Sequence, residues 1–178
     1  DKDERPAISN VARQVSHPDF RNDNSFRYDV KLMFLEEPLT GVQVVGLGDG
    51  PDPPNVLTVI GFGNVKSGGS SSDILLEVSV ETASDNLCEL QYGGRYRRDI
   101  MFCAGQAGLD ACQGDSGGPM MDAAGRQVGI VSFGGGCAQS DAFGVYTRVS
   151  ALREWIEGQI CAGSTFAESF GYCGAPPT

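Results

Sequence analysis

The residue best suited to chemistry in this sequence is Ser116, which stands in the run Asp110-Ala111-Cys112-Gln113-Gly114-Asp115-Ser116-Gly117-Gly118-Pro119. A serine hydroxyl is a weak nucleophile, so a site that uses one must activate it and must stabilise the oxyanion that follows its attack on a carbonyl. Gly114 and Gly117 flank the serine, and residues without a Cβ let the backbone turn tightly beside a substrate. In such a turn the amides of Gly114 and Ser116 can converge on one oxyanion. The run therefore predicts a nucleophile in a tight turn.

The same glycines fit other motifs less well. Gly114 to Gly118 satisfy G-x-S-x-G, the nucleophile elbow of α/β-hydrolases, which requires a helix directly after the serine and a histidine downstream. Pro119 and a short apolar pair follow here, and no histidine lies beyond position 17. The triplet at 134–136 is compatible with a phosphate-binding loop, but no Gly-Lys-Ser/Thr follows it. We disfavour both alternatives, and also a glycine turn without chemistry, because further segments match the first interpretation.

The run around Ser116 resembles the nucleophile segment of the trypsin/chymotrypsin family of serine proteases. The resemblance covers residues 7 to about 160. It implies that Ser116 is the nucleophile and that the Gly114 and Ser116 amides form the oxyanion hole. Asp110 matches the carboxylate at the base of the specificity pocket in trypsin-like members. Asp115 matches the residue that binds the N-terminal amine freed by zymogen cleavage; that amine belongs to an isoleucine- or valine-led segment, and Asp1 is not it.

The resemblance supplies an orienting acid but no general base. Tyr28-Asp29-Val30 is similar to the family's aspartate-isoleucine-alanine-leucine stretch, which makes Asp29 the acid that would orient an imidazole. His17 is the only histidine in the chain. It precedes a proline instead of standing in the family's alanine-histidine-cysteine context, and it resembles the histidine–proline turn found shortly before the catalytic aspartate. We therefore interpret His17 as a loop residue, and the general base is missing from the sequence.

Two further segments match the walls of a specificity pocket. Ser132-Phe133-Gly134 would pair with a bound peptide as an edge strand, and Gly144 belongs to the second wall. Glycine at 134 and 144 keeps the slot open to a long side chain. Ala111 lacks the hydroxyl that many trypsin-like members carry beside the pocket carboxylate, and this favours arginine over lysine as the guest.

The composition limits what the chain can bind. With 13 Lys and Arg against 23 Asp and Glu the net charge is −10, which argues against nucleic acid and anionic membranes as partners. No apolar run approaches the roughly 18 residues that a membrane-spanning helix needs. Arg95, Arg97 and Arg98 form a basic cluster. We interpret this cluster as an exposed loop, with substrate contact as the alternative.

The six cysteines indicate disulfides rather than a metal site. They contain no C-x-x-C pair, so no metal is expected, and an even count in a glycine-rich chain is typical of an oxidising compartment. Spacing alone leaves the pairing open. The family resemblance implies two bridges around the specificity pocket and leaves the remaining two cysteines as a third pair: Cys88–Cys103, Cys112–Cys137 and Cys161–Cys173.

Frequent glycine and proline, with almost no helical periodicity, favour an all-β fold. A turn-rich linker with tandem prolines at 48–54 provides the best domain boundary. The regular elements expected from apolar patterning are strands at 42–47, 56–62, 74–80 and 127–133, a short helix after Ser84, and a C-terminal helix after the N-cap Ser150.

The resemblance implies a chymotrypsin-like double β-barrel with a complete second barrel, a partial first barrel and a C-terminal helix. Residues 1–48 would be the C-terminal part of the first barrel. Residues 49–160 would form the second barrel with the helix, and residues 161–178 a disulfide-closed extension.

These expectations describe a secreted, trypsin-like endopeptidase that cleaves after Arg, and less well after Lys, through an acyl-enzyme on Ser116. Its partners would be protein or peptide substrates and protease inhibitors, and it would need no cofactor or metal. Because the general-base His and the activation N-terminus are missing, we expect a fragment that is inactive as an isolated chain. The alternative is a catalytically inactive protease homologue that acts as a binding or inhibitory module.

Overall fold

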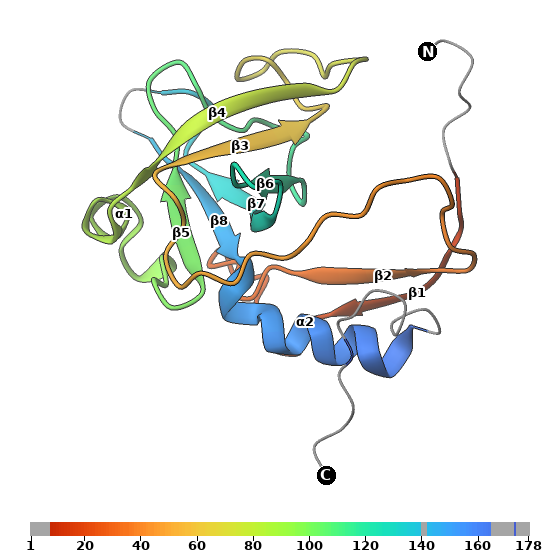
Figure 1. The fold of residues 1–178 in the computed structure, drawn as a ribbon. Coiled ribbons are helices and arrows are strands. Elements are labelled where there is room, and N and C mark those ends of the chain that lie inside the picture. The colour runs from red at the N-terminus through yellow and green to blue at the C-terminus, as the bar shows by residue number, and fades with distance from the viewer. Residues whose placement is uncertain (1–7, 140–141, 165–172, 174–178) are drawn as a thin grey trace. The chain divides into compact units, whose positions relative to one another are not determined.

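The computed structural model describes residues 8–139, 142–164 and 173, which form a mainly β structure ending in a helix (Figure 1). In chain order the elements are β1 (Val11–Ser16), β2 (Lys31–Leu35), β3 (Val56–Gly61), β4 (Leu76–Ala83), α1 (Asp85–Tyr92), the 3-10 turn η1 (Gly93–Arg95), β5 (Met101–Ala104), β6 (Pro119–Met121), β7 (Gln127–Gly134), β8 (Gly144–Arg148) and α2 (Val149–Gly163). No helix among the described residues is long and apolar enough to cross a membrane.

Six of the strands form a closed antiparallel barrel in the order β3-β4-β5-β8-β7-β6, and β6 pairs back with β3. Side chains alternate between the two faces of each strand, so Leu57 and Val59 both point inward and are 1% and 2% exposed. The rings of Phe102 and Tyr146 stack in the same core with centroids 5.6 Å apart. Closure leaves these six strands without a free edge, and the core holds the frame on which the site is built.

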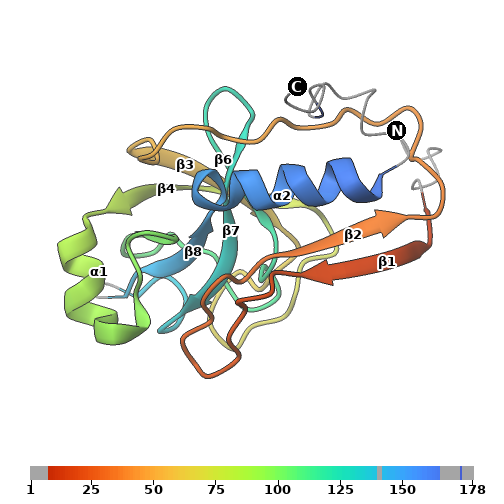
Figure 2. The same ribbon diagram turned by 90° about the horizontal axis from the view of Figure 1, so that it is seen from below.

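The remaining two strands form a separate antiparallel hairpin, β1–β2, in which Val15 lies opposite Leu32 (Figure 2). Within it the Arg13 guanidinium carbon lies 4.1 Å from the centre of the Phe34 ring. Met33 on β2 is 60% exposed. The hairpin therefore has strand pairing but little buried apolar surface.

The chain separates into two compact units. The barrel unit comprises residues 17–30 and 45–153, and the hairpin unit comprises, among the described residues, 8–16, 31–44, 154–164 and 173. Asp29 thus belongs to the barrel unit, although both strands that flank it in sequence belong to the hairpin unit. The expected division at 48/49 and the extension at 161–178, most of which lies outside the described residues, stay predictions.

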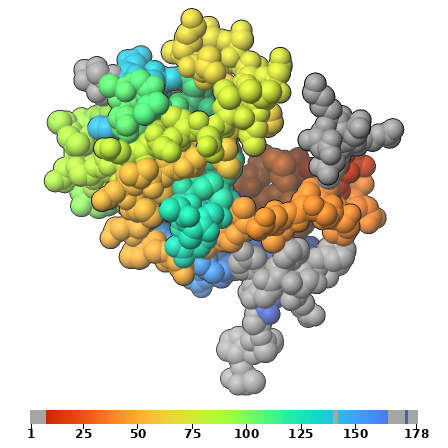
Figure 3. All heavy atoms as spheres, turned by 45° about the horizontal axis from the view of Figure 1, so that its top comes forward, coloured from red at the N-terminus to blue at the C-terminus, as the bar shows by residue number. Residues whose placement is uncertain are grey.

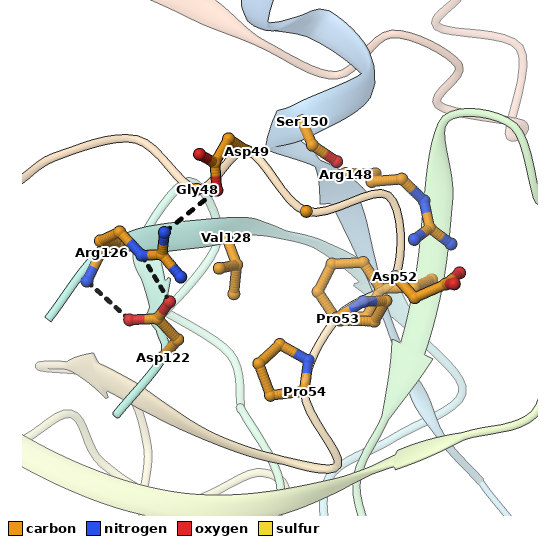
Figure 4. Close-up of a pocket in the computed structure, with 12 residues that line it drawn as sticks. Gly48, Asp49, Asp52, Pro53, Pro54, Asp122, Arg126, Val128, Arg148 and Ser150 are labelled. Carbon is orange, nitrogen blue, oxygen red and sulfur yellow. Dashed lines mark hydrogen bonds and ion pairs between the residues drawn. The ribbon is translucent and has the colours of Figure 1, made fainter. Parts of the chain in front are cut away.

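The expected linker at 48–54 belongs to the barrel unit and is hydrogen-bonded within it. Arg126 donates from Nη1 to Asp49 Oδ1 at 3.0 Å and from Nε to Asp122 Oδ2 at 2.9 Å (Figure 4). Arg148 is 8% exposed and donates from Nη1 to the Pro51 carbonyl at 2.6 Å. In the space-filling view the β6–β7 turn, coloured teal, lies against the orange segment near residue 50 (Figure 3). A cavity of about 70 Å³ remains between these groups.

Two expected elements were wrong. Residues 42–47 do not form a strand; Leu47 makes only an isolated parallel bridge with Gln127, and Val42 and Val44 are 49% and 59% exposed. An apolar run becomes a strand only when another backbone pairs with it, and the described residues provide that partner at one position. The helix α2 begins at Val149, so Ser150 lies in its first turn and is not the N-cap.

Strand β4 also begins later than expected, at Leu76, and Ile74 is 68% exposed. The short helix is correct, since Ser84 is the N-cap of α1, but its side chain makes no capping hydrogen bond.

Candidate active site

Ser116 is exposed in the turn between β5 and β6, and the strand β6 begins three residues later. Gly114 has φ of 100° and Gly117 has φ of 81°, a region that favours glycine. A Cβ on Gly114 would also lie 3.0 Å from the Cα of Gly63. Because a strand and not a helix follows Ser116, the α/β-hydrolase elbow does not apply.

Two peptide groups in this turn are fixed by hydrogen bonds to their carbonyls. The carbonyl before Gly114 accepts from the Asn64 amide at 2.8 Å, and the carbonyl before Ser116 accepts from the Gly118 amide at 2.8 Å. In a trans peptide the C=O and N–H bonds point in opposite directions. The N–H groups of Gly114 and Ser116 therefore point away from those two donors.

Asp110 and Ser116 line the same cavity, of about 230 Å³. The Tyr146 hydroxyl donates to Asp110 Oδ1 and the Ala138 amide donates to Oδ2, both at 3.4 Å. A Cβ on Gly144 would lie 2.9 Å from Asp110 Oδ1, so glycine leaves the carboxylate accessible. The other expected pocket residues also line this cavity: Ala111, Ser132, Phe133 and Gly134.

The carboxyl group of Asp110 is poorly solvated. Burial raises its pKa to about 6, and the hydrogen bonds from the Ala138 and Ala111 amides and from Tyr146 only partly oppose that rise. Burial likewise raises the pKa of the Tyr146 hydroxyl, and the neighbouring Asp110 charge adds to the rise. A positive charge placed beside this carboxyl would lower its pKa again.

Two residues that the sequence analysis missed hold both pocket walls. The Tyr92 hydroxyl accepts from the Gly135 amide at 3.1 Å and donates to the Phe143 carbonyl. Gln91 Oε1 accepts from the Phe143 amide at 3.2 Å. Both residues lie at the C-terminal end of α1, and no motif in the sequence points to them. The one sequence feature that could have placed this helix near the pocket was Cys88, which lies on the same helix and is bonded to Cys103.

Asp29 is held in the barrel unit by the strands that form the pocket. Ser132 Oγ donates to Asp29 Oδ2 at 2.7 Å, and Thr147 Oγ1 donates to the Asp29 carbonyl at 2.9 Å. Tyr28, just before it, has φ of 55°, an unusual value for a bulky residue. The structure therefore brings Asp29 to Ser132, one of the residues that line the Asp110 cavity.

His17 is occupied by local contacts. Its Nδ1 accepts from the Asp19 amide at 3.2 Å, and its ring stacks on Tyr28 with centroids 4.6 Å apart. Burial lowers the pKa of His17, while the charge of Asp19 opposes that shift. These contacts agree with the interpretation of His17 as a loop residue.

Asp115 has backbone partners on both carboxylate oxygens. Oδ1 accepts from the Gly63 amide at 2.8 Å and Oδ2 accepts from the Cys112 amide at 2.9 Å. The carboxylate borders a second cavity of about 210 Å³. A Cβ on Gly61 or Gly63 would overlap this carboxylate, so glycine at both positions makes room for it.

Three disulfides are present, in the pairs that the family resemblance implies: Cys88–Cys103, Cys112–Cys137 and Cys161–Cys173. The first connects α1 to β5, and the second connects the nucleophile run to the loop after β7. Among the described residues no group of three or more His, Cys, Asp or Glu side chains is placed to hold a metal ion.

Comparison with known proteins gives consistent matches. The profile of the Trypsin family matches residues 1–156. A trypsin from Saccharopolyspora erythraea is 36% identical over 162 residues, which are 88% of this chain and 70% of that protein. A trypsin from Sus scrofa is 39% identical over 160 residues, 86% and 68% of the two chains. The vitellin-degrading protease of Bombyx mori is 37% identical over 153 residues, 81% of this chain and 57% of that one.

Among solved structures, neuropsin, a serine protease expressed in the limbic system of mouse brain, superposes with a TM-score of 0.80 at 32% identity. The match covers 85% of this chain and 71% of neuropsin. The family profile covers most of the chain, and the barrel, second sheet and C-terminal helix agree with it. The chain therefore belongs to the trypsin family of serine proteases and has their chymotrypsin-like β fold.

Proposed function

We propose that this chain carries the nucleophile, oxyanion hole, orienting acid and specificity pocket of a secreted endopeptidase that cleaves after Arg and, less well, after Lys. The observation that carries the proposal is the cavity that both Asp110 and Ser116 line. A long cationic side chain that reaches Asp110 would leave its own carbonyl near Ser116. The three disulfides support an oxidising, extracellular location.

In the proposed reaction Ser116 Oγ attacks the scissile carbonyl and loses its proton to a general base. The Gly114 and Ser116 N–H groups hold the resulting oxyanion, and the loss of one such donor typically raises the barrier by ~3 kcal/mol. The intermediate collapses to an acyl-enzyme on Ser116 as the amine leaves with that proton. Water then releases the acid by the reverse sequence of proton transfers.

The base in this reaction is an imidazole that Asp29 would orient and, once charged, stabilise. The hydrogen bond from Ser132 fixes one carboxylate oxygen of Asp29 and leaves the other to accept from that imidazole. His17 is unsuited to the role because its Nδ1 already accepts from the Asp19 amide. The reaction therefore requires an imidazole from outside residues 1–178, and residues 1–178 alone should be inactive.

Asp115 would also need a partner group from another segment, in this case an N-terminal amine. Its carboxylate borders a cavity and would pair there with an N-terminal amine freed by zymogen cleavage. The backbone hydrogen bonds from Gly63 and Cys112 would hold the carboxylate in place until that amine arrives.

The preference for arginine follows from Ala111. Lysine has a compact, strongly hydrated ammonium that reaches a pocket carboxylate less well and relies on a neighbouring hydroxyl, which Ala111 lacks. Arginine can pair bidentately with Asp110. One lost hydrogen bond to a charged group is worth about 1.5–3 kcal/mol, so we expect kcat/KM to favour arginyl over lysyl substrates roughly tenfold or more. The ratio should fall in Ala111→Ser.

The proposal is tested in the full protein that contains this chain, with matched arginyl, lysyl and neutral peptide substrates. Ser116→Ala should abolish hydrolysis, and Asp110→Asn should remove the preference for cations. Asp99 is an exposed carboxyl that pairs with Arg97, and Asp99→Asn should change neither property. Wild-type protein that binds arginyl peptide through Asp110 without hydrolysing it would replace the proposal with the alternative, an inactive homologue that acts as a binding or inhibitory module.

A further inference from the structure

The three arginines of the basic cluster have different surroundings. Arg97 pairs with Asp99 at 3.3 Å, and Arg98 pairs with Glu89 at 2.8 Å. Arg95 forms no ion pair with any carboxylate of the residues that the structure describes. Its charge is therefore not neutralised locally, in a chain whose net charge is −10.

Arg95 is also fixed in position. Its Nε donates to the Asn24 carbonyl at 2.6 Å, and its guanidinium carbon lies 4.8 Å from the centre of the Phe133 ring. Phe133 contacts Phe26 and Tyr92 as well, at 5.7 and 5.4 Å between ring centroids. A cation–π contact and one charged hydrogen bond thus hold the guanidinium over an aromatic cluster. Within the part of the chain that the structure describes, both terminal NH₂ groups remain as donors.

This aromatic cluster adjoins the Asp110 cavity, because Phe133 lines that cavity together with Ser132 and Gly134. A peptide whose basic residue enters the cavity would extend along this segment as an added strand. A strand advances about 3.3 Å per residue and alternates its side chains between two faces. The residues before the basic one therefore pass the Phe133 ring within a few positions.

We propose that Arg95 forms a subsite that selects an acidic side chain two to four residues before the cleaved bond. The inference rests on the proposed function, since it needs a basic residue in the Asp110 cavity to set the register of the peptide. The planar guanidinium presents two donors to a carboxylate in the geometry that suits bidentate pairing. The preferred substrate thus carries one negative charge upstream of the arginine.

The test uses the full protein with Ser116→Ala, so that binding is measured without hydrolysis. Fluorescein-labelled peptides ending in arginine carry Asp, or isosteric and neutral Asn, at each of the second to fourth positions before the cleaved bond. At one of these positions we expect Asp to bind about two- to fivefold more tightly than Asn, the range of an exposed ion pair. The advantage should shrink as NaCl rises from 50 mM to 500 mM, because added salt screens exposed charges.

Arg95→Ala should abolish the preference for Asp, and Arg95→Glu should reverse it, so that the Asn peptide binds more tightly than the Asp peptide. Arg97→Ala removes the same charge two residues away and should leave the preference intact. Equal binding of the Asp and Asn peptides at all three positions, or a preference that survives Arg95→Ala, overturns the inference. Hydrolysis by the protein with Ser116 intact tests the proposed function separately, since cleavage after arginine without any acidic preference would leave that function standing.

Discussion

The barrel unit and the hairpin unit contain β-structure of two different kinds. In the barrel unit the strands close on themselves around side chains such as Phe102 and Tyr146, which are 2% exposed or less. In the hairpin unit two strands pair only with each other, and Met33 and Val44 are about 60% exposed. Paired strands alone are therefore no measure of stability; the amount of apolar surface that they bury decides it.

Every residue assigned to the proposed site lies in the barrel unit. Even Asp29, which sits in sequence between the two hairpin strands, is hydrogen-bonded to Ser132 and Thr147 of the barrel. The proposed site, which would hold a nucleophile, two amides and a half-buried carboxylate within fractions of an ångström, needs rigid support. The comparison thus predicts that equivalent changes in the two units will have unequal effects.

The largest difference is expected for apolar truncation. Phe102→Ala would remove a ring that stacks on Tyr146 in the barrel core, and such changes destabilise by about 3–5 kcal/mol. Met33→Ala changes an exposed side chain and should stay within about 0.5 kcal/mol. Hydrogen exchange of the β3 and β8 amides measures the loss of stability in Phe102→Ala. Exchange of the β1 and β2 amides measures the loss in Met33→Ala. Similar losses at both positions would show that the hairpin unit has a core of its own.

A smaller difference is expected for cations that lie over aromatic rings. Arg148 is buried above Phe102 and donates to the Pro51 carbonyl, so Arg148→Ala should destabilise the barrel unit by about 2–3 kcal/mol through lost charged hydrogen bonds. Arg13 lies over Phe34 in the hairpin unit, and Arg13→Ala should lower stability by only about 0.5–1 kcal/mol. Urea titration followed by hydrogen exchange gives both values. The comparison fails if Arg13→Ala proves the more damaging of the two.

The contrast between the units also explains what the sequence could predict. Ser116, Asp110 and the glycines near them belong to short, local motifs whose spacing is visible in the chain, and the structure brings Asp110 and Ser116 to one cavity. Strand patterns were reliable where the barrel buries alternate residues, as at Leu57 and Val59. They failed at 42–47, where apolar residues find almost no pairing partner among the described residues.

Contacts between segments that are distant in sequence could not be predicted from motifs or from apolar patterning. Gln91 and Tyr92 hold both pocket walls through hydrogen bonds between their side chains and the backbone of distant segments, and the helical pattern of α1 does not specify these bonds. The position of Arg95 over Phe133 depends in the same way on tertiary structure, since the sequence does not distinguish Arg95 from Arg97 and Arg98, for which it predicts an exposed loop with substrate contact as the alternative. Residues in short motifs can therefore be predicted from the sequence, whereas the residues that position the pocket walls are identified only from the fold.

Two glycines with positive φ provide a finer comparison. Gly114 has φ of 100° and close backbone neighbours, so Gly114→Ala combines conformational strain with a 3.0 Å contact to Gly63 and should destabilise by about 2 kcal/mol. Gly41, in the hairpin unit, has φ of 75° and nothing within 4 Å of an added Cβ, so Gly41→Ala should lose about 1 kcal/mol from strain alone. Only Gly114→Ala should also lower kcat in the full protein, because it displaces an amide of the proposed oxyanion hole. Thermal unfolding and arginyl-substrate kinetics of the two variants separate these effects.

The smallest expected effect concerns the pH dependence of Asp110. Its pKa of about 6 in the folded chain lies above the ordinary value of 3.8, because burial disfavours the charged carboxylate. The stability that this group contributes is therefore fully present below pH 4 and is lost as the pH rises through about 6.

Asp110→Asn should consequently raise the Tm at pH 8 by about 2–4 °C, the shift that corresponds to about 1 kcal/mol in a chain of this size, and should change the Tm less at pH 4. Arginyl-peptide binding should show the opposite dependence, weakening as the pH falls below about 6, because the guest pairs with the carboxylate form. Glu36→Gln removes an exposed carboxyl from the hairpin unit and is the matched control; it should produce neither effect. Differential scanning calorimetry and peptide titration between pH 4 and pH 8 measure both. A Tm that falls in Asp110→Asn at pH 8 would contradict this prediction. It would mean that the two long hydrogen bonds stabilise the Asp110 carboxylate more than burial destabilises it. The pocket would then need no cationic guest.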